Sequence, residues 1–163
     1  MTSDEQMRAE RTSENGFEVG ARQAFDFLCS NLRFRCVASK PNFVHYQSPS
    51  VYFEVRYSVS YDHEVFARIG RLAPESLPER SVESVDFGLF LAVADPGGYA
   101  AIHHDVPYQI AHTEAEVRRV LSYYAAGLEG YGLPLLSGDE TAYAQARELR
   151  WWHAPPNALQ TSE

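Results

Sequence analysis

The residues with the clearest chemical potential are histidines and an aspartate in the second half of the chain. His103, His104 and Asp105 are consecutive, and His112 lies a few residues further along the chain. Imidazole and carboxylate groups bind zinc and similar ions, and an aspartate can orient a histidine that acts as a general base. In an extended strand, however, adjacent histidines point to opposite faces, so only one could share a site with Asp105. The alternatives are a site of a small metal-dependent hydrolase and a solvated loop or hydrogen-bonded strand edge without a catalytic role, and we expect the loop or edge.

A second set of residues has the chemistry of a protein-binding surface. Tyr52 lies beside Glu54 and Arg56 on the polar side of a predicted strand, and Trp151 and Trp152 end the predicted last helix. Tyrosine, tryptophan and arginine are enriched among the residues that anchor protein interfaces. The competing interpretation is that a tryptophan closes the core and that Tyr52 pairs across the sheet.

The common signatures of catalysis are missing from the sequence. It contains no G-x-S-x-G, no P-loop, no H-E-x-x-H and no G-x-G-x-x-G. Asp62, His63 and Glu64 lie where a hairpin turn is expected, and aspartate favours turns through its own hydrogen bonds. Cys29 and Cys36 are expected to stay as thiols, because the cytosol keeps cysteines reduced, and their spacing matches no zinc site. The protein-binding interpretation therefore includes no catalytic residue, cofactor or metal.

Hydrophobic periodicity predicts the elements that hold these residues. Helical spacing predicts an amphipathic helix that ends near residue 31 and buries Phe17, Ala21, Ala24, Phe25, Leu28 and Leu32. Residues 34–38 and 43–47 are typical of a β-hairpin, since a polar break containing proline separates them. Residues 51–61 alternate between apolar and polar side chains, as a half-buried strand does, and residues 64–72 are predicted to return as its partner.

The second half of the chain is predicted to be mainly helical. Ser84 is expected to cap a helix that ends at residue 94, whereas residues 99–110 are expected to be irregular or a short edge strand. Thr113 and Glu116 form a capping box that begins the next helix, and a last helix is expected over residues 139–151. Because strands come early and helices late, the sequence predicts an α+β fold, with an antiparallel sheet of about four strands and helices packed on one face.

Length and charge limit the class of protein. A chain of 163 residues suits one domain, which we expect over residues 16–152, between a flexible polar lead-in (1–15) and a polar tail (153–163). The first residues lack a secretion signal and no apolar run could span a membrane, so we expect a cytoplasmic protein without a membrane partner. A net charge of −8 opposes binding to nucleic acid and favours a basic partner.

The order of the predicted elements resembles that of small bacterial α+β proteins. The resemblance is carried by residues 51–57, 61–64, 69–72, 133–139 and 149–150. In this respect the chain is similar to immunity proteins that neutralise bacterial polymorphic toxins. The resemblance implies a non-enzymatic protein that binds a cognate toxin, and it carries over no catalytic residues. An apolar strand at the sheet edge could also support a homodimer.

Overall fold

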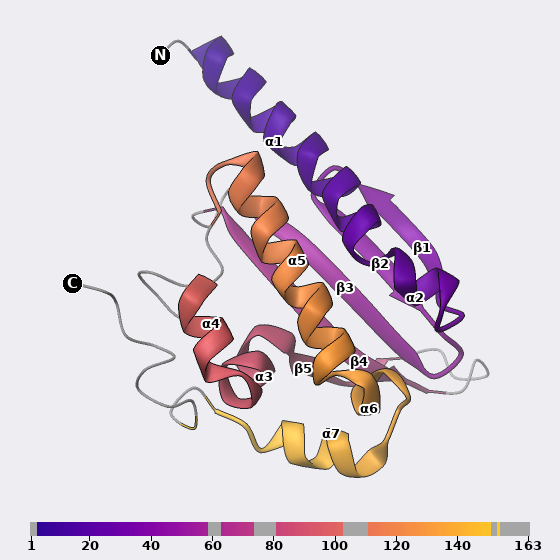
Figure 1. The fold of residues 1–163 in the computed structure, drawn as a ribbon. Coiled ribbons are helices and arrows are strands. Elements are labelled where there is room, and N and C mark those ends of the chain that lie inside the picture. The colour runs from indigo at the N-terminus through magenta and orange to yellow at the C-terminus, as the bar shows by residue number, and fades with distance from the viewer. Residues whose placement is uncertain (1–2, 59–62, 74–80, 103–110, 151–152, 154–163) are drawn as a thin grey trace.

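The computed structural model describes residues 3–58, 63–73, 81–102, 111–150 and 153 (Figure 1). Its centre is a five-stranded antiparallel sheet in which the strands are neighbours in chain order. The strands are β1 (Arg35–Lys40), β2 (Phe43–Gln47), β3 (Val51–Ser58), β4 (Glu64–Leu72) and β5 (Ser81–Asp86). The predicted α+β class and antiparallel sheet are confirmed, with five strands in place of about four.

The inner face of the sheet is set by the alternation of side chains along β3. Val51, Phe53, Val55 and Tyr57 are almost fully buried and belong to the hydrophobic core. In the β3–β4 register, Phe53 lies opposite Ile69, which is also fully buried. Residues that lie opposite each other on antiparallel strands have their side chains on the same face of the sheet. The alternation along β3 therefore determines which side chains of the neighbouring strands pack into the core.

The prediction of a helix starting at Ser84 is wrong, because this segment forms the fifth strand. Ser84 lies opposite Gly70 in the β4–β5 ladder, and the helix begins only at Phe87. The N-cap is Asp86, whose carboxylate accepts a hydrogen bond from the backbone N–H of Leu89 at 3.1 Å. The strand continues into the helix with no intervening loop. Serine and aspartate both cap helices well, so the sequence alone allows a helix start after Ser84 or after Asp86.

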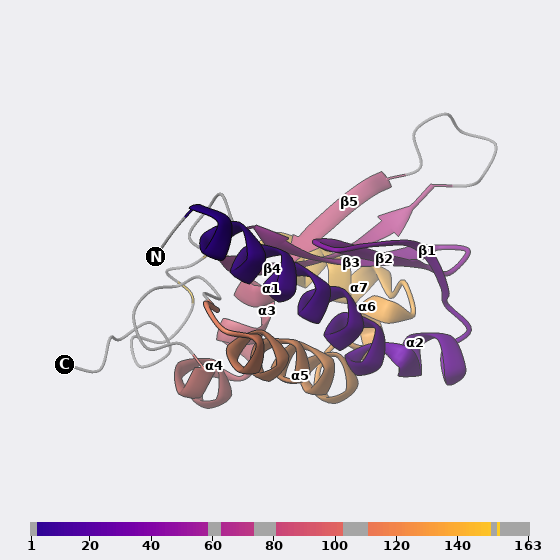
Figure 2. The same ribbon diagram turned by 90° about the horizontal axis from the view of Figure 1, so that it is seen from above.

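The helices lie on one side of the sheet, and the other side has no helix over it among the described residues (Figure 2). The two long helices, α1 (Ser3–Ala24) and α5 (Glu114–Gly130), pack against each other. The predicted capping box of α5 is confirmed. The Thr113 hydroxyl accepts from the backbone N–H of Glu116, and the Glu116 carboxylate accepts from that of Thr113, both at 3.2 Å.

The first helix begins and ends earlier than predicted. Helix α1 starts at Ser3, within the segment expected to be a flexible lead-in, because the early residues include many good helix formers. It ends at Ala24, and the short helix α2 (Asp26–Ser30) follows. The predicted buried face is present, with full burial of Phe17, Ala21, Phe25 and Leu28 and partial burial of Ala24 and Leu32.

Short helices complete this layer. They are α3 (Phe87–Ala94), α4 (Pro96–Ile102), α6 (Leu133–Leu136) and α7 (Glu140–Arg147). Helix α4 includes the start of the segment expected to be irregular, while residues 103–110 lie outside the described residues. The predicted N-cap of the last helix is confirmed, because the Asp139 carboxylate accepts from the backbone N–H of Ala142 at 2.8 Å. The predicted end near residue 151 is wrong, because the helix ends at Arg147.

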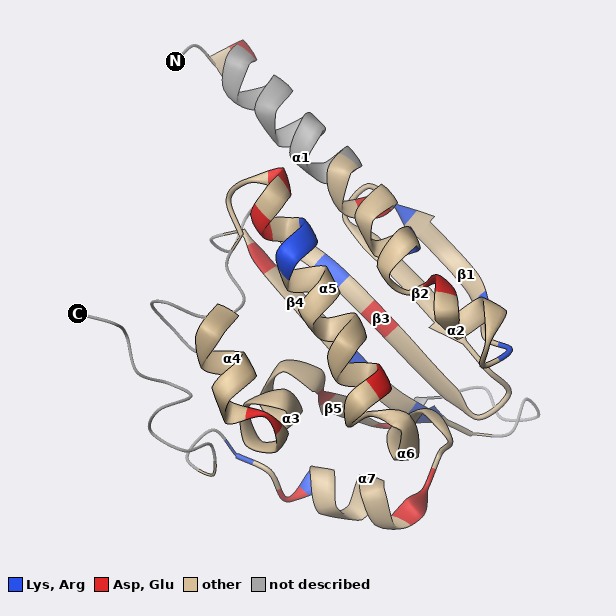
Figure 3. Ribbon diagram, in the orientation of Figure 1, with Lys and Arg blue, Asp and Glu red and all other residues tan. Residues whose placement is uncertain are grey.

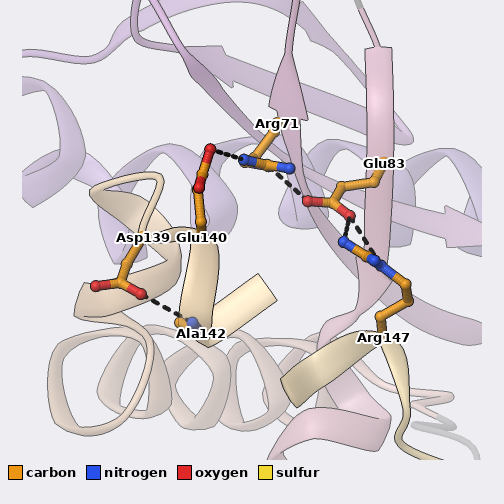
Figure 4. Close-up of polar contacts among 6 residues, drawn as sticks. All are labelled: Arg71, Glu83, Asp139, Glu140, Ala142 and Arg147. Carbon is orange, nitrogen blue, oxygen red and sulfur yellow. Dashed lines mark hydrogen bonds and ion pairs between the residues drawn. The ribbon is translucent and has the colours of Figure 1, made fainter. Parts of the chain in front are cut away.

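A carboxylate shared by two arginines attaches α7 to the sheet (Figure 4). Glu83 of β5 accepts from Nε of Arg71 at 2.5 Å and from the guanidinium of Arg147 at 2.8 Å. The Arg71 guanidinium also lies 5.4 Å from the ring centroid of Tyr143 and 3.6 Å from the carboxylate of Glu140. These contacts join β4, β5 and α7 at one end of the sheet.

Candidate recognition surface

The outer face of the sheet, opposite the helices, is the strongest candidate for a functional site. The β4–β5 hairpin rises beside it, and no helix of the described residues crosses it (Figure 2). The antiparallel registers of β2, β3 and β4 align its side chains in the cross-strand rows Gln47–Tyr52–Gly70, His45–Glu54–Arg68 and Phe43–Arg56–Phe66. Aromatic, arginine and carboxylate groups therefore gather on one uncovered surface.

Tyr52 is buried on this open face because its ring lies over a glycine. Only 6% of Tyr52 is exposed. A Cβ atom added at Gly70 would come within 3.0 Å of both the Tyr52 ring and the carbonyl oxygen of Glu83. The ring also stacks on the imidazole of His45, with centroids 5.4 Å apart and planes inclined by 9°. Tyr52 is thus a fixed part of the surface.

His45 is held through both of its ring nitrogens. Its Nδ1 lies 3.2 Å from Oε2 of Glu54, and its Nε2 lies 3.0 Å from the amide nitrogen of Gln47. An amide nitrogen only donates, so Nε2 of His45 is the acceptor and Nδ1 carries the proton that is donated to Glu54. The other oxygen of Glu54 lies 3.6 Å from Nε of Arg56. The imidazole is therefore fixed in orientation and tautomer.

Glu54 is an ionised carboxylate that is buried on the outer face. Burial by itself raises the pKa of Glu54, but the hydrogen bond from His45 and the positive charge of Arg56 outweigh this effect. The net result is a pKa below the usual value for glutamate. Because the residue is only 7% exposed and its oxygens contact its neighbours, Glu54 orients other side chains and is poorly placed to contact a partner.

Two arginines on this face are stacked on phenylalanine rings. The guanidinium carbon of Arg56 lies 4.5 Å from the ring centroid of Phe43, and that of Arg68 lies 5.2 Å from the ring centroid of Phe66. A guanidinium over an aromatic ring is attracted by the ring's quadrupole and still has N–H donors along its edge. The Arg56 side chain is 57% exposed, so these donors can reach a partner.

The structure brings together three of the residues that the sequence suggested. Tyr52, Glu54 and Arg56 share the outer face, whereas Trp151 and Trp152 lie outside the described residues. Tyr52 does pair across the sheet, as its competing interpretation expected. Six cross-strand neighbours that complete the surface were not predicted from the sequence, although the register of the two hairpins could have identified them. They are Phe43, His45, Gln47, Phe66, Arg68 and Gly70.

The histidine group of the alternative hypothesis is only partly within the described structure. His103, His104 and Asp105 lie outside the described residues. The ring of His112 contacts that of His63, with centroids 4.9 Å apart. In the part of the chain that the structure describes, no group of three or more His, Cys, Asp and Glu side chains could hold a metal ion. A histidine pair supplies fewer protein ligands than zinc sites use.

The cysteines and the turn before β4 are structural features. Cys29 and Cys36 are both free thiols, as expected. Cys29 is an exposed residue, but desolvation by its neighbours and the nearby charge of Asp26 raise the pKa of its thiol, which disfavours the thiolate at neutral pH. His63 lies in the turn that was predicted at this position and has a φ of 58°, a backbone conformation that turns often require.

An apolar hollow on the helical side is a weaker candidate. Its volume is about 280 Å³, and its walls include Phe90, Val93, Leu135 and Leu149. Tyr131, which also lines it, is 45% exposed. Specific ligand sites combine apolar walls with several placed polar groups, and this hollow is lined mainly by apolar side chains. The outer face of the sheet therefore offers more recognisable chemistry.

Comparison with known proteins finds no matching family model, no matching curated protein and no matching solved structure. None of the described helices combines the length and apolar character needed to cross a bilayer. The function must therefore be inferred from the chemistry of the outer face.

Proposed function

We propose that this protein is a non-enzymatic module that binds another protein through the outer face of its sheet. The observation that carries the proposal is the interlocking of the side chains on this face. Tyr52 is seated over Gly70 and stacks on His45, while Arg56 is stacked on Phe43. Aromatic and arginine side chains dominate the energetics of protein interfaces, and side chains that are already ordered lose less conformational freedom on binding.

Within this class, we propose an immunity-type protein that neutralises a bacterial toxin by covering part of its surface. Tight inhibition requires slow dissociation, and a preformed surface favours it because little ordering is needed when the complex forms. The division of the fold into a helical side and a sheet side supports this role, since the helices bury the core and leave the opposite face for a partner.

Site-specific cross-linking in the native cell tests the binding function. A photo-reactive amino acid is placed at position 56 of the full chain, and position 118 on α5 is the matched control. The side chains of Arg56 and Arg118 are 57% and 55% exposed. We expect a discrete cross-linked protein from position 56 and none from position 118. No product from position 56, equal products from both, or a cross-link to a second copy of this chain would contradict the proposal.

The immunity role has a separate test, which uses the partner that the cross-link identifies. Expression of the partner alone should arrest growth, and co-expression with this protein should restore it. Tyr52→Ala should weaken the rescue, whereas Arg118→Ala on the helical side should not. A partner that is harmless on its own would contradict the immunity role while leaving the binding function in place.

A further inference from the structure

The outer face differs in charge from the chain as a whole. The net charge is −8, and Asp and Glu positions are visible on α2, α5 and α7 of the helical layer (Figure 3). On the outer side of the five strands, the cross-strand registers instead place three carboxylates among four cations: Glu54, Glu64 and Asp86, with Arg35, Lys40, Arg56 and Arg68. The recognition surface is therefore locally cationic in an acidic protein.

The carboxylates near this surface are already engaged or partly buried. Glu54 is 7% exposed and contacts His45 and Arg56. Burial, together with the nearby charge of Asp86, raises the pKa of Glu64 and makes it easier to neutralise. Asp86, at the end of β5, uses its carboxylate to accept the hydrogen bond that caps α3. None of these three groups is well placed to attract a cationic partner.

Three of the four cations, in contrast, are exposed. Arg35 and Lys40 are exposed along β1. Arg68 is half-buried between Glu54 and Asp86 in its cross-strand row, where its charge opposes the rise in pKa that burial causes in both carboxylates, but it forms no ion pair within 4 Å in the described parts of the chain. Arg56 and Arg68 are each stacked on a phenylalanine ring, so their guanidinium groups are oriented before a partner arrives. An oriented guanidinium can bind a carboxylate through two parallel hydrogen bonds.

Building on the proposed protein-binding function, we infer that the outer face recognises an acidic segment of its partner, in which several Asp or Glu side chains meet Arg56, Arg68 and Lys40. A basic partner, which the net charge alone favours, would bring its cations against these side chains. The negative helical layer opposes an acidic partner only weakly. The reason is distance, because a helix with its side chains is about 10 Å across and salt at physiological ionic strength screens charges over about 8 Å. The carboxylates of the helical layer are therefore largely screened from a partner on the outer face.

Single-stranded nucleic acid also carries anions, but this surface offers its bases little to stack on. Phe43 and Phe66 already have an arginine over the ring, and Tyr52 is 6% exposed. Sequence-tolerant binding of single strands depends on accessible aromatic faces in addition to a basic groove. A polypeptide, which needs only the arginine and lysine donors, fits the observations better.

Backbone amide NMR of the full chain tests the inference with three probes of equal length: a deca-glutamate peptide, a deca-lysine peptide and deca-thymidine. We expect deca-glutamate to shift the amide resonances of β2, β3 and β4 and to bind more tightly than the other two probes. In the Arg56→Gln/Arg68→Gln variant the affinity should fall about tenfold, as expected for two lost charged contacts. The Arg118→Gln variant is the control and should bind as the wild type does. The amide spectra also show whether each variant is folded.

Each other outcome overturns the inference in a distinct way. Binding of deca-lysine to the outer face would make the partner basic, and tighter binding of deca-thymidine would make it a nucleic acid. No shifts with deca-glutamate, shifts confined to the helices, or equal losses in the outer-face and Arg118 variants would remove the acidic segment as the ligand. Failure of the proposed function is distinguishable, because it would appear as the absence of a cross-linked protein from position 56.

Discussion

The Gly70→Ala substitution tests how the recognition surface is assembled. The added Cβ would come within 3.0 Å of both the Tyr52 ring and the carbonyl oxygen of Glu83. The ring can turn away, but the carbonyl belongs to the backbone of β5 and moves only if the β4–β5 ladder shifts. Overpacking of this kind costs about 1–3 kcal/mol in the free energy of unfolding. We expect the upper end of that range, because both neighbours must move together.

Urea unfolding measures this effect as a change in midpoint at constant m-value. Gly97→Ala is the matched control. It adds a Cβ within α4 where no atom lies within 4 Å, and it should be neutral or stabilise by up to about 1 kcal/mol. A double-mutant cycle then isolates the ring. In a Tyr52→Ala background, Gly70→Ala should cost about 1 kcal/mol less than in the wild type, with the remainder due to the Glu83 carbonyl.

Two results would refute this account of the surface. If Gly70→Ala is as stable as Gly97→Ala, the close contacts at Gly70 do not exist in solution. If the effects of Gly70→Ala and Tyr52→Ala are additive, the ring and the glycine do not interact. In either case Tyr52 would lose its role as a fixed anchor.

Other substitutions test the remaining polar contacts. The pKa of Glu54 is lowered in the folded state, so its charge stabilises the fold above about pH 4.5 and this contribution is lost as the pH falls through the folded pKa. The urea midpoints of wild type and Glu54→Gln should therefore converge in acid, and a gap independent of pH would contradict this. Glu83→Ala breaks charge-assisted bonds to β4 and α7 and should cost about 2 kcal/mol. The control is Glu114→Ala, which removes an exposed i,i+4 pair and should cost less than about 0.5 kcal/mol. Equal urea midpoints for Glu83→Ala and Glu114→Ala would contradict the proposed role of Glu83 in attaching α7. Thr113→Ala should lower stability by about 1 kcal/mol in thermal unfolding, because it removes the side-chain cap of α5, and an unchanged midpoint would contradict that role.

Local patterns in the sequence were sufficient where a single element decides the structure. Residues 51–58 alternate because one side of β3 faces the core, and Thr113 and Glu116 satisfy donors within their own helix turn. The same local logic could not identify β5. Its pairing with β4 depends on long-range contacts such as Ser84 with Gly70, and no loop separates it from α3, because Asp86 is both the last residue of β5 and the N-cap of that helix.

The candidate site was only half predictable for the same reason. Tyr52, Glu54 and Arg56 follow one another on one side of a single strand, so their shared face could be inferred from alternation. Their partners come from other strands. His45 reaches Glu54, and Gly70 lies under Tyr52, only because the registers of two hairpins align them. A register shift of one residue would turn every one of these side chains to the opposite face.

The proposed binding function gives a physical reason for the burial of Glu54 on an uncovered face. Replacing a buried ion pair with packed apolar side chains is often neutral or stabilising, so stability alone would not favour a carboxylate there. Glu54 instead orients two anchors at once, since it contacts His45, which stacks on Tyr52, and Arg56, which lies over Phe43. Anchors fixed in this way need little further ordering when a partner binds. Under the proposed function, the carboxylate therefore holds these anchors in their binding orientation, in addition to the stabilisation that its ionised form gives the fold above about pH 4.5.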